Sequence, residues 1–144
     1  GNLFFAWANK FYTGGSAETQ AALERTIRET CDKTAEKLGE QYDKLVQFPL
    51  YKAPAFRKAY LDSVMADSYG YAGTEIIRRV VGDSKVMEGT SVTDPAQRLP
   101  MERALIQLGI YLIKNRAGGL NGAAVTEEFR KILAEGRGTH GQNG

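Results

Sequence analysis

The sequence predicts an all-α fold, a helical bundle of about five helices. Apolar residues recur at spacings of three and four along most of the chain, which is the period of a helix with one packed face. Runs that alternate between apolar and polar residues and end at turn residues, the pattern of strands, are missing. Glycines and prolines separate the helical stretches and give each one a start and an end.

The first two predicted helices are divided by a pair of glycines. The first covers about residues 3–12 and stops before Gly14 and Gly15, which supply the permissive backbone of a helix end. The second begins at Ser16 or Ala17 and is long. Its expected packed stripe consists of Leu23, Ile27, Cys31, Thr34, Leu38, Tyr42 and Leu45.

A third long helix and a proline-containing fourth helix follow. Two prolines within 48–54 end the second helix, because each removes a backbone donor, and the third helix then runs over about 54–81. Asp94 and Pro95 form a helix start, with the aspartate as the cap and the proline as the first helical residue. Because Pro100 interrupts the pattern, we expect one short turn and then a separate helix over about 100–116.

The last predicted helix covers about 125–135, with Phe129 as one of its packing residues. We expect one helical domain over 1–136 and a disordered tail over 137–144, because that tail is rich in glycine. The only histidine, His140, lies in this tail, where it lacks the fixed partner that a catalytic base needs.

Composition excludes several classes of function. The chain has 144 residues, 42% of them hydrophobic, with a net charge of +2, which predicts one compact domain and neither a nucleic-acid partner nor a membrane partner. No apolar run approaches the length of a membrane span, so we expect a soluble, cytoplasmic protein. With one cysteine, Cys31, and one histidine, the sequence predicts no disulfide and no metal site.

The third helix is apolar on two sides. One sector consists of Leu61, Met65, Tyr69, Ala72, Ile76 and Val80, and a second, of smaller residues, consists of Ala66, Gly70, Gly73 and Ile77. At 100° per residue these sectors face different directions, so we expect the helix to be buried on most sides. Another helix can approach closely along the small-residue sector.

Charged residues in the second half of this helix need partners if the helix is buried. Glu75 precedes Arg78 and Arg79 by three and four residues, and Asp67, Tyr71 and Arg78 share a stripe. One interpretation is a set of helical ion pairs at the domain edge. The other is that one or both arginines hold an anionic or polyhydroxylated ligand, which suits the planar fork of a guanidinium.

The same residues resemble a known family. The stretches 60–64 (YLDSV) and 72–82 (AGTEIIRRVVG) are similar to the C-terminal region of methylthioribose kinases, which have a two-lobed, protein-kinase-like fold. Residues 1–6 (GNLFFA) resemble the helix that follows the metal-binding loop of that family, and residues 91–95 (SVTDP) resemble the connection after its arginine pair.

The resemblance implies a function for the whole kinase and a smaller role for this chain within it. The family phosphorylates the 1-hydroxyl of 5-methylthioribose with ATP and magnesium in methionine salvage. By position, the resemblance assigns the role of the substrate-binding arginines of that family to Arg78 and Arg79. The chain shows no glycine-rich phosphate loop, nucleotide-clamping lysine, catalytic-loop aspartate or metal-binding loop. We therefore expect the helical C-terminal part of such a kinase, with no catalytic, cofactor-binding or metal-binding residue of its own, and inactive alone.

Two further expectations concern partners. Since no initiator methionine precedes Gly1, we expect a piece of a longer protein whose missing N-terminal kinase portion binds ATP and magnesium. Its loss should expose apolar residues, including some of Leu3, Phe4, Phe5 and Trp7, and favour self-association, for example as a homodimer. The alternative function is a free-standing helical interaction module without catalysis.

Overall fold

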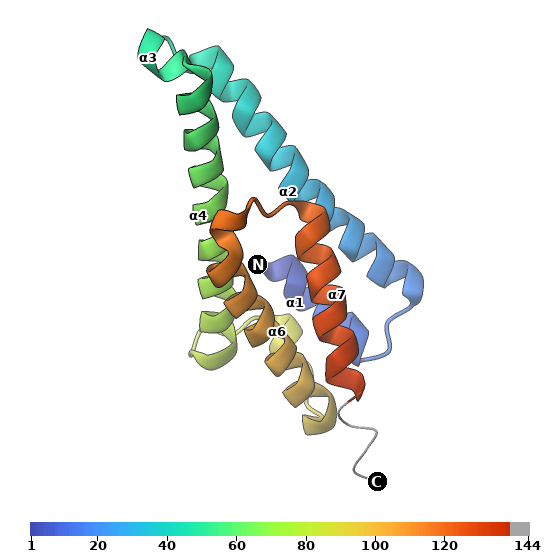
Figure 1. The fold of residues 1–144 in the computed structure, drawn as a ribbon. Helices are drawn as coiled ribbons and strands as arrows, with labels where there is room; N and C mark the ends of the chain where they lie inside the picture. Colours follow the sequence, from blue (N-terminus) through green and yellow to red (C-terminus); the bar gives the residue numbers. More distant parts are fainter. Residues whose placement is uncertain (139–144) are drawn as a thin grey trace.

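The computed structural model describes residues 1–138, and all of the regular secondary structure in that range is helical, which confirms the predicted all-α class (Figure 1). The elements are α1 (Asn2–Tyr12), α2 (Ala17–Leu45), α3 (Pro49–Lys52), α4 (Pro54–Val81), α5 (Met87–Thr90), α6 (Pro95–Asn115), the 3-10 helix η1 (Arg116–Gly118) and α7 (Gly122–Gly138). The part of the predicted tail from residue 139 on, with His140, lies outside the described residues, whereas Arg137 and Gly138 continue α7.

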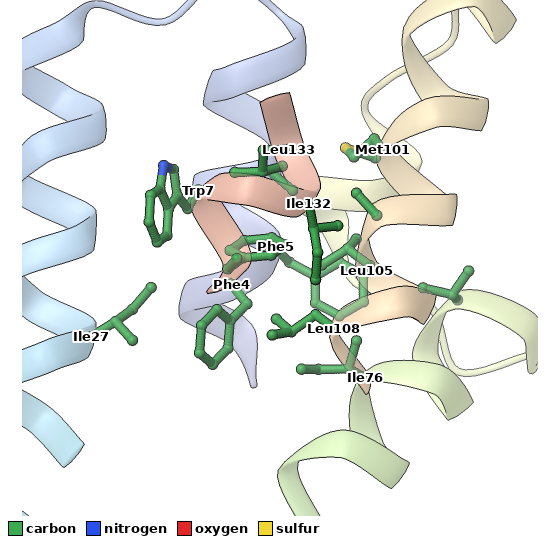
Figure 2. Close-up of a cluster of buried hydrophobic side chains, with 14 of the residues drawn as sticks. Phe4, Phe5, Trp7, Ile27, Ile76, Met101, Leu105, Leu108, Ile132 and Leu133 are labelled. Atoms are coloured by element: carbon green, nitrogen blue, oxygen red, sulfur yellow. The ribbon is translucent and has the colours of Figure 1, made fainter. Parts of the chain in front are cut away.

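The core lies where α1 packs between α2, α6 and α7 (Figures 1 and 2). Phe129 of α7 is fully buried and meets the rings of Phe4 and Trp7 edge to face, with centroids 5.4 and 5.2 Å apart. Phe5 is buried as well. Our expectation that these N-terminal apolar residues form an exposed surface is therefore wrong: only Leu3 among them is even partly accessible, because α1 is itself a central element of the core.

The far halves of α2 and α4 form an arm that extends from this core and carries α3 at its tip (Figure 1). Residues 32–37 of α2 are exposed on every side, so Thr34 is exposed, and so is Leu45, although both belong to the predicted packed stripe. Ile27 and Tyr42 of that stripe are buried, as predicted. The stripe is only partly packed because the arm has one helix, not a bundle, on its inner side.

Within the body, α4 crosses α6 at very close range through two glycines. A Cβ atom added to Gly73 would lie 2.6 Å from the carbonyl oxygen of Gly109, and one added to Gly109 would lie 2.7 Å from Cγ1 of Ile77. Backbones approach this closely only where side chains are absent. The close approach predicted along the small-residue sector of α4 is confirmed, and α6 is the helix that makes it.

The prediction that α4 is buried on most sides is wrong. Its first half belongs to the arm, and Tyr60 and Tyr71 are 46% and 76% exposed. Ile76 and Val80, nearer its end, are buried against the core. The helix is therefore anchored to the body only along its second half.

A single helix, α6, replaces the predicted turn and separate helix around Pro100. Asp94 caps it as predicted, since its carboxylate accepts a hydrogen bond from the backbone N–H of Ala96 at 2.9 Å. Pro100 is buried early in the helix, where its ring removes one hydrogen bond, to the carbonyl four residues earlier. Burial of the ring against the core offsets that loss.

Candidate functional site: the arginine pair of α4

The last turns of α4 bring both predicted site arginines onto one carboxylate. Arg78 donates two hydrogen bonds to Glu75, from Nε to Oε2 at 2.9 Å and from Nη2 to Oε1 at 2.8 Å. Arg79 donates from Nε to Oε1 of the same glutamate at 2.5 Å. The two guanidinium groups point about 100° apart around the helix, and Glu75, one turn earlier, lies between them.

The packing of the last turns of α4 fixes the position of these side chains. Ile76 and Val80 are buried in the last turns of α4 and fix them against the core. The backbone N–H of Gly82 donates the last hydrogen bond of the helix, to the carbonyl of Arg78 at 2.8 Å. Lys85 donates from Nζ to the carbonyl of Val80. The arginines therefore project from a fixed helix end and not from a loop.

The summed charge of these three side chains is positive and constant near neutral pH. The hydrogen bonds from Arg78 and then Arg79 lower the pKa of Glu75 from its ordinary 4.5 to about 2, so this carboxylate stays ionised. One negative charge between two guanidinium groups leaves a net charge of +1. Arg78 is about half exposed and Arg79 about one quarter exposed, so both are within reach of a ligand.

Several guanidinium donors remain available after the contacts with Glu75. Within residues 1–138, the hydrogen bonds of this pair use Nε of both arginines and Nη2 of Arg78. The Nη1 group of Arg78 and both Nη groups of Arg79 are left to meet an anion or a set of hydroxyl groups. Glu75 thus orients the arginines without occupying all of their donors.

Gly1 lies beside this site. A Cβ atom added to it would lie 3.9 Å from Cγ of Glu75 and 3.9 Å from Cγ1 of Ile76. The start of the chain and the arginine pair are therefore neighbours in space, although more than seventy residues separate them in the sequence. Sequence spacing gave no indication of this contact.

Other members of the predicted charged stripe do not join the site. Asp67 faces Arg116 instead, with an Oδ1 to Nη1 distance of 3.6 Å, and Tyr71 is largely exposed. Cys31 is half-buried, as its place on the packed stripe predicts, and burial raises the pKa of its thiol. Residues 1–138 contain no cluster of three metal-ligating side chains, and no helix among them is long and apolar enough to cross a bilayer.

The protein is all-α, with an arginine pair at the end of a long helix, and its sequence is similar to those of small-molecule kinases. It is 42% identical over 60 residues to the methylthioribose kinase of Erwinia tasmaniensis, a match that covers 42% of this chain and 15% of the relative. It is 33% identical over 88 residues to that of Exiguobacterium sibiricum, covering 58% of this chain and 23% of the relative. It is 32% identical over 102 residues to that of Citrobacter koseri, covering 69% and 26%.

These similarities confirm the predicted resemblance to the methylthioribose kinase family. The chain spans about a quarter or less of the length of these relatives. No protein-family model matches it.

Proposed function

We propose that this chain is the C-terminal helical part of a small-molecule kinase that phosphorylates the 1-hydroxyl of 5-methylthioribose with ATP and magnesium, as a step of methionine salvage in the cytoplasm. In this proposal Arg78 and Arg79 bind the sugar and the charge that develops during phosphoryl transfer. The missing N-terminal kinase portion binds ATP and magnesium, and the chain alone is inactive. The observation that carries the proposal is the arginine pair held on Glu75 beside Gly1.

The chemistry of phosphoryl transfer supports a role for this pair. The transferred group spreads negative charge over three oxygens, and catalysis depends on cations that are already in place. Arg78 and Arg79 meet that requirement, because Glu75 fixes their Nε groups and leaves Nη donors exposed. A salt bridge that served stability alone would contribute little at this exposure.

The position of Gly1 also supports the proposal. In the family that the chain resembles, residues 1–6 correspond to the helix after the metal-binding loop. Since Gly1 lies against Glu75, a loop that preceded it in a longer protein would enter beside Arg78 and Arg79. Metal-bound phosphates and the arginine pair would then meet at one place, which transfer to a sugar hydroxyl requires.

Binding calorimetry tests the proposal directly. The purified chain is titrated with 5-methylthioribose and, separately, with ATP and magnesium; Arg78→Ala and Arg79→Ala are compared with Arg98→Ala. Arg98 is a matched control, because it forms a similar helical pair with Glu102 on α6. We expect the sugar to bind, each site variant to bind it about tenfold more weakly or worse, since a charge-assisted hydrogen bond is lost, and ATP not to bind.

Three outcomes would contradict this proposal. Turnover of ATP by the chain with methylthioribose would show that it is not an inactive part. Sugar binding that survives both arginine substitutions would remove their role. Absence of sugar binding would contradict a substrate site in the isolated chain and favour the alternative below.

The second candidate function is a helical interaction module, which the tip of the arm favours. Six large apolar residues are exposed there: Leu45, Phe48, Leu50, Tyr51, Phe56 and Tyr60. Exposed apolar patches of this kind mark interaction sites. We propose this tip, in place of the N-terminal residues, as the surface for any self-association; light scattering of Phe48→Ser should then show less association than the parent chain, and equal association would contradict it.

A further inference from the structure

A pocket lies away from the arginine pair, between α2, α4 and the segment that joins α6 to α7. Its volume is about 390 Å³, within the range of roughly 300–1,000 Å³ that is typical of small-molecule sites. Tyr69, on its wall, precedes Glu75 by six residues, or about 9 Å along α4, and neither Arg78 nor Arg79 lines it. It is therefore a separate site.

The walls of this pocket are fixed by close contacts. Arg116 lies directly over Gly70, where an added Cβ atom would meet its Nη1 at 3.0 Å. Gly119 turns the chain with a φ of 72°, a conformation that favours glycine. The backbone N–H of Gly122 then donates to Oδ1 of Asp32 at 2.9 Å and fastens the segment to α2.

The lining carries both signs of charge around an apolar floor. Arg116 makes one ion contact among the described residues, with Asp67 at 3.6 Å, and its side chain is half exposed. Asp62 pairs at 2.5 Å with Lys58, a largely exposed side chain one turn away, and such pairs open readily. Asp32 has one oxygen engaged by Gly122.

The floor contains a buried polar group that lacks an oxygen or nitrogen partner. Tyr69 is 6% exposed, and its hydroxyl has no such hydrogen-bond partner within residues 1–138. The Cys31 thiol, a weak hydrogen-bonding group, lies beside it. Among the described residues this thiol is the polar group recorded beside the hydroxyl, so the Tyr69 ring closes this wall of the pocket with its hydroxyl covered.

We propose that this pocket binds a small zwitterion with an apolar side chain, the chemistry of a free α-amino acid. The carboxylate meets Arg116, whose guanidinium fork matches it. The ammonium meets Asp32 and Asp62, and the apolar side chain lies on Met65 and Leu120. The two cations and two carboxylates of the lining leave the empty pocket neutral, which suits a ligand that is neutral overall.

Nuclear magnetic resonance of the ¹⁵N-labelled full chain tests this proposal. The probes are L-leucine, L-methionine and L-phenylalanine at about 20 mM, enough to detect millimolar dissociation constants. Leucinamide and N-acetylleucine, which lack the carboxylate and the ammonium charge respectively, are the matched ligands. We expect at least one free amino acid to shift the amide signals of Tyr69 and Leu120 and to leave those of Arg78 and Arg79 in place, while the two derivatives bind about tenfold more weakly.

Variants identify the groups that bind. Arg116→Gln should weaken the binding of the amino acid about tenfold. It should leave the weak binding of leucinamide unchanged, because leucinamide has no carboxylate. Asp62→Asn should also weaken the binding of the amino acid, and a dispersed spectrum of this variant shows that it is folded. Arg98→Gln, an ion-paired arginine on α6, should change nothing. The proposal is overturned if none of the three amino acids shifts these signals, or if the derivatives bind as well as the free amino acids.

Discussion

Replacing Gly73 with alanine should destabilise the protein, because this glycine sets the distance between α4 and α6. The added Cβ atom would lie 2.6 Å from the carbonyl oxygen of Gly109, 2.9 Å from Cγ1 of Ile113 and 3.2 Å from Cβ of Leu112. The nearest of these atoms is backbone, which cannot turn aside, so the helices must separate. Overpacking of this kind costs about 1–3 kcal/mol, and a clash with backbone lies at the upper end of that range. Against it stands a gain of about 1 kcal/mol from the better helix propensity of alanine. We expect a net loss of about 2 kcal/mol.

Urea denaturation followed by circular dichroism measures this change as a lower midpoint with an unchanged slope. Gly118→Ala is the matched control, since a Cβ atom there would meet nothing within 4 Å, and its stability should stay within about 0.5 kcal/mol of the parent. Gly73→Ala should also weaken the binding of any ligand to Arg78 and Arg79, because α4 carries both arginines. A Gly73→Ala chain as stable as the parent would refute the close approach of the two helices.

Three other predictions follow from single contacts. The folded-state pKa of Glu75 is about 2 and its ordinary value is 4.5, so its ion pairs stabilise the fold fully above about pH 4.5 and are lost as the pH falls from there toward 2. In thermal melts, Glu75→Gln should therefore flatten the dependence of stability on pH over that interval. An unchanged pH dependence would contradict the pairing. Tyr69→Phe should leave the free chain as stable or raise its stability by up to about 1 kcal/mol, because the hydroxyl it removes lacks an oxygen or nitrogen partner; a clear fall in melting temperature would reveal a partner. Phe129→Ala should cost about 3–5 kcal/mol in denaturation experiments, because this ring is fully buried between Phe4 and Trp7, and a cost below 1 kcal/mol would contradict this core.

Periodicity and helix-boundary residues predicted much of the fold. The starts and ends of α1, α2 and α4 agree with the expected ranges to within about two residues, because glycines and prolines act locally at each boundary. The error at Pro100 has a local cause too: a proline early in a helix loses one hydrogen bond, and burial against the core, a tertiary effect, decides that the helix continues.

The arm could not be predicted from periodicity. The stripe of α2 continues through Thr34 to Leu45 with the same spacing as its buried part, yet those two residues are exposed. Spacing shows which residues share a face and leaves open whether another element covers that face. The expectation that some of Leu3, Phe4, Phe5 and Trp7 are exposed had a different origin, the loss of an N-terminal kinase portion, and it failed because α1 packs inside the core of this chain.

The site was predicted in part. The i, i+3 and i, i+4 spacing of Glu75, Arg78 and Arg79 predicts their contacts, and the structure has them. The proximity of Gly1 and the pocket at Tyr69 depend on contacts between residues distant in sequence. The apolar sector of α4 did predict that Tyr69 is buried, but the prediction treated it as a packing residue and not as part of a pocket.

The most direct test of the central claim, that Arg78 and Arg79 form a sugar-binding site, is the response of their side-chain Nε–Hε signals to 5-methylthioribose in the ¹⁵N-labelled chain. Both Nε groups are hydrogen-bonded to Glu75, so their signals should be sharp and resolved. The account predicts that both shift as the sugar is added and that the signal of Arg98, paired with Glu102, does not. Unchanged Arg78 and Arg79 signals at saturating sugar would contradict it.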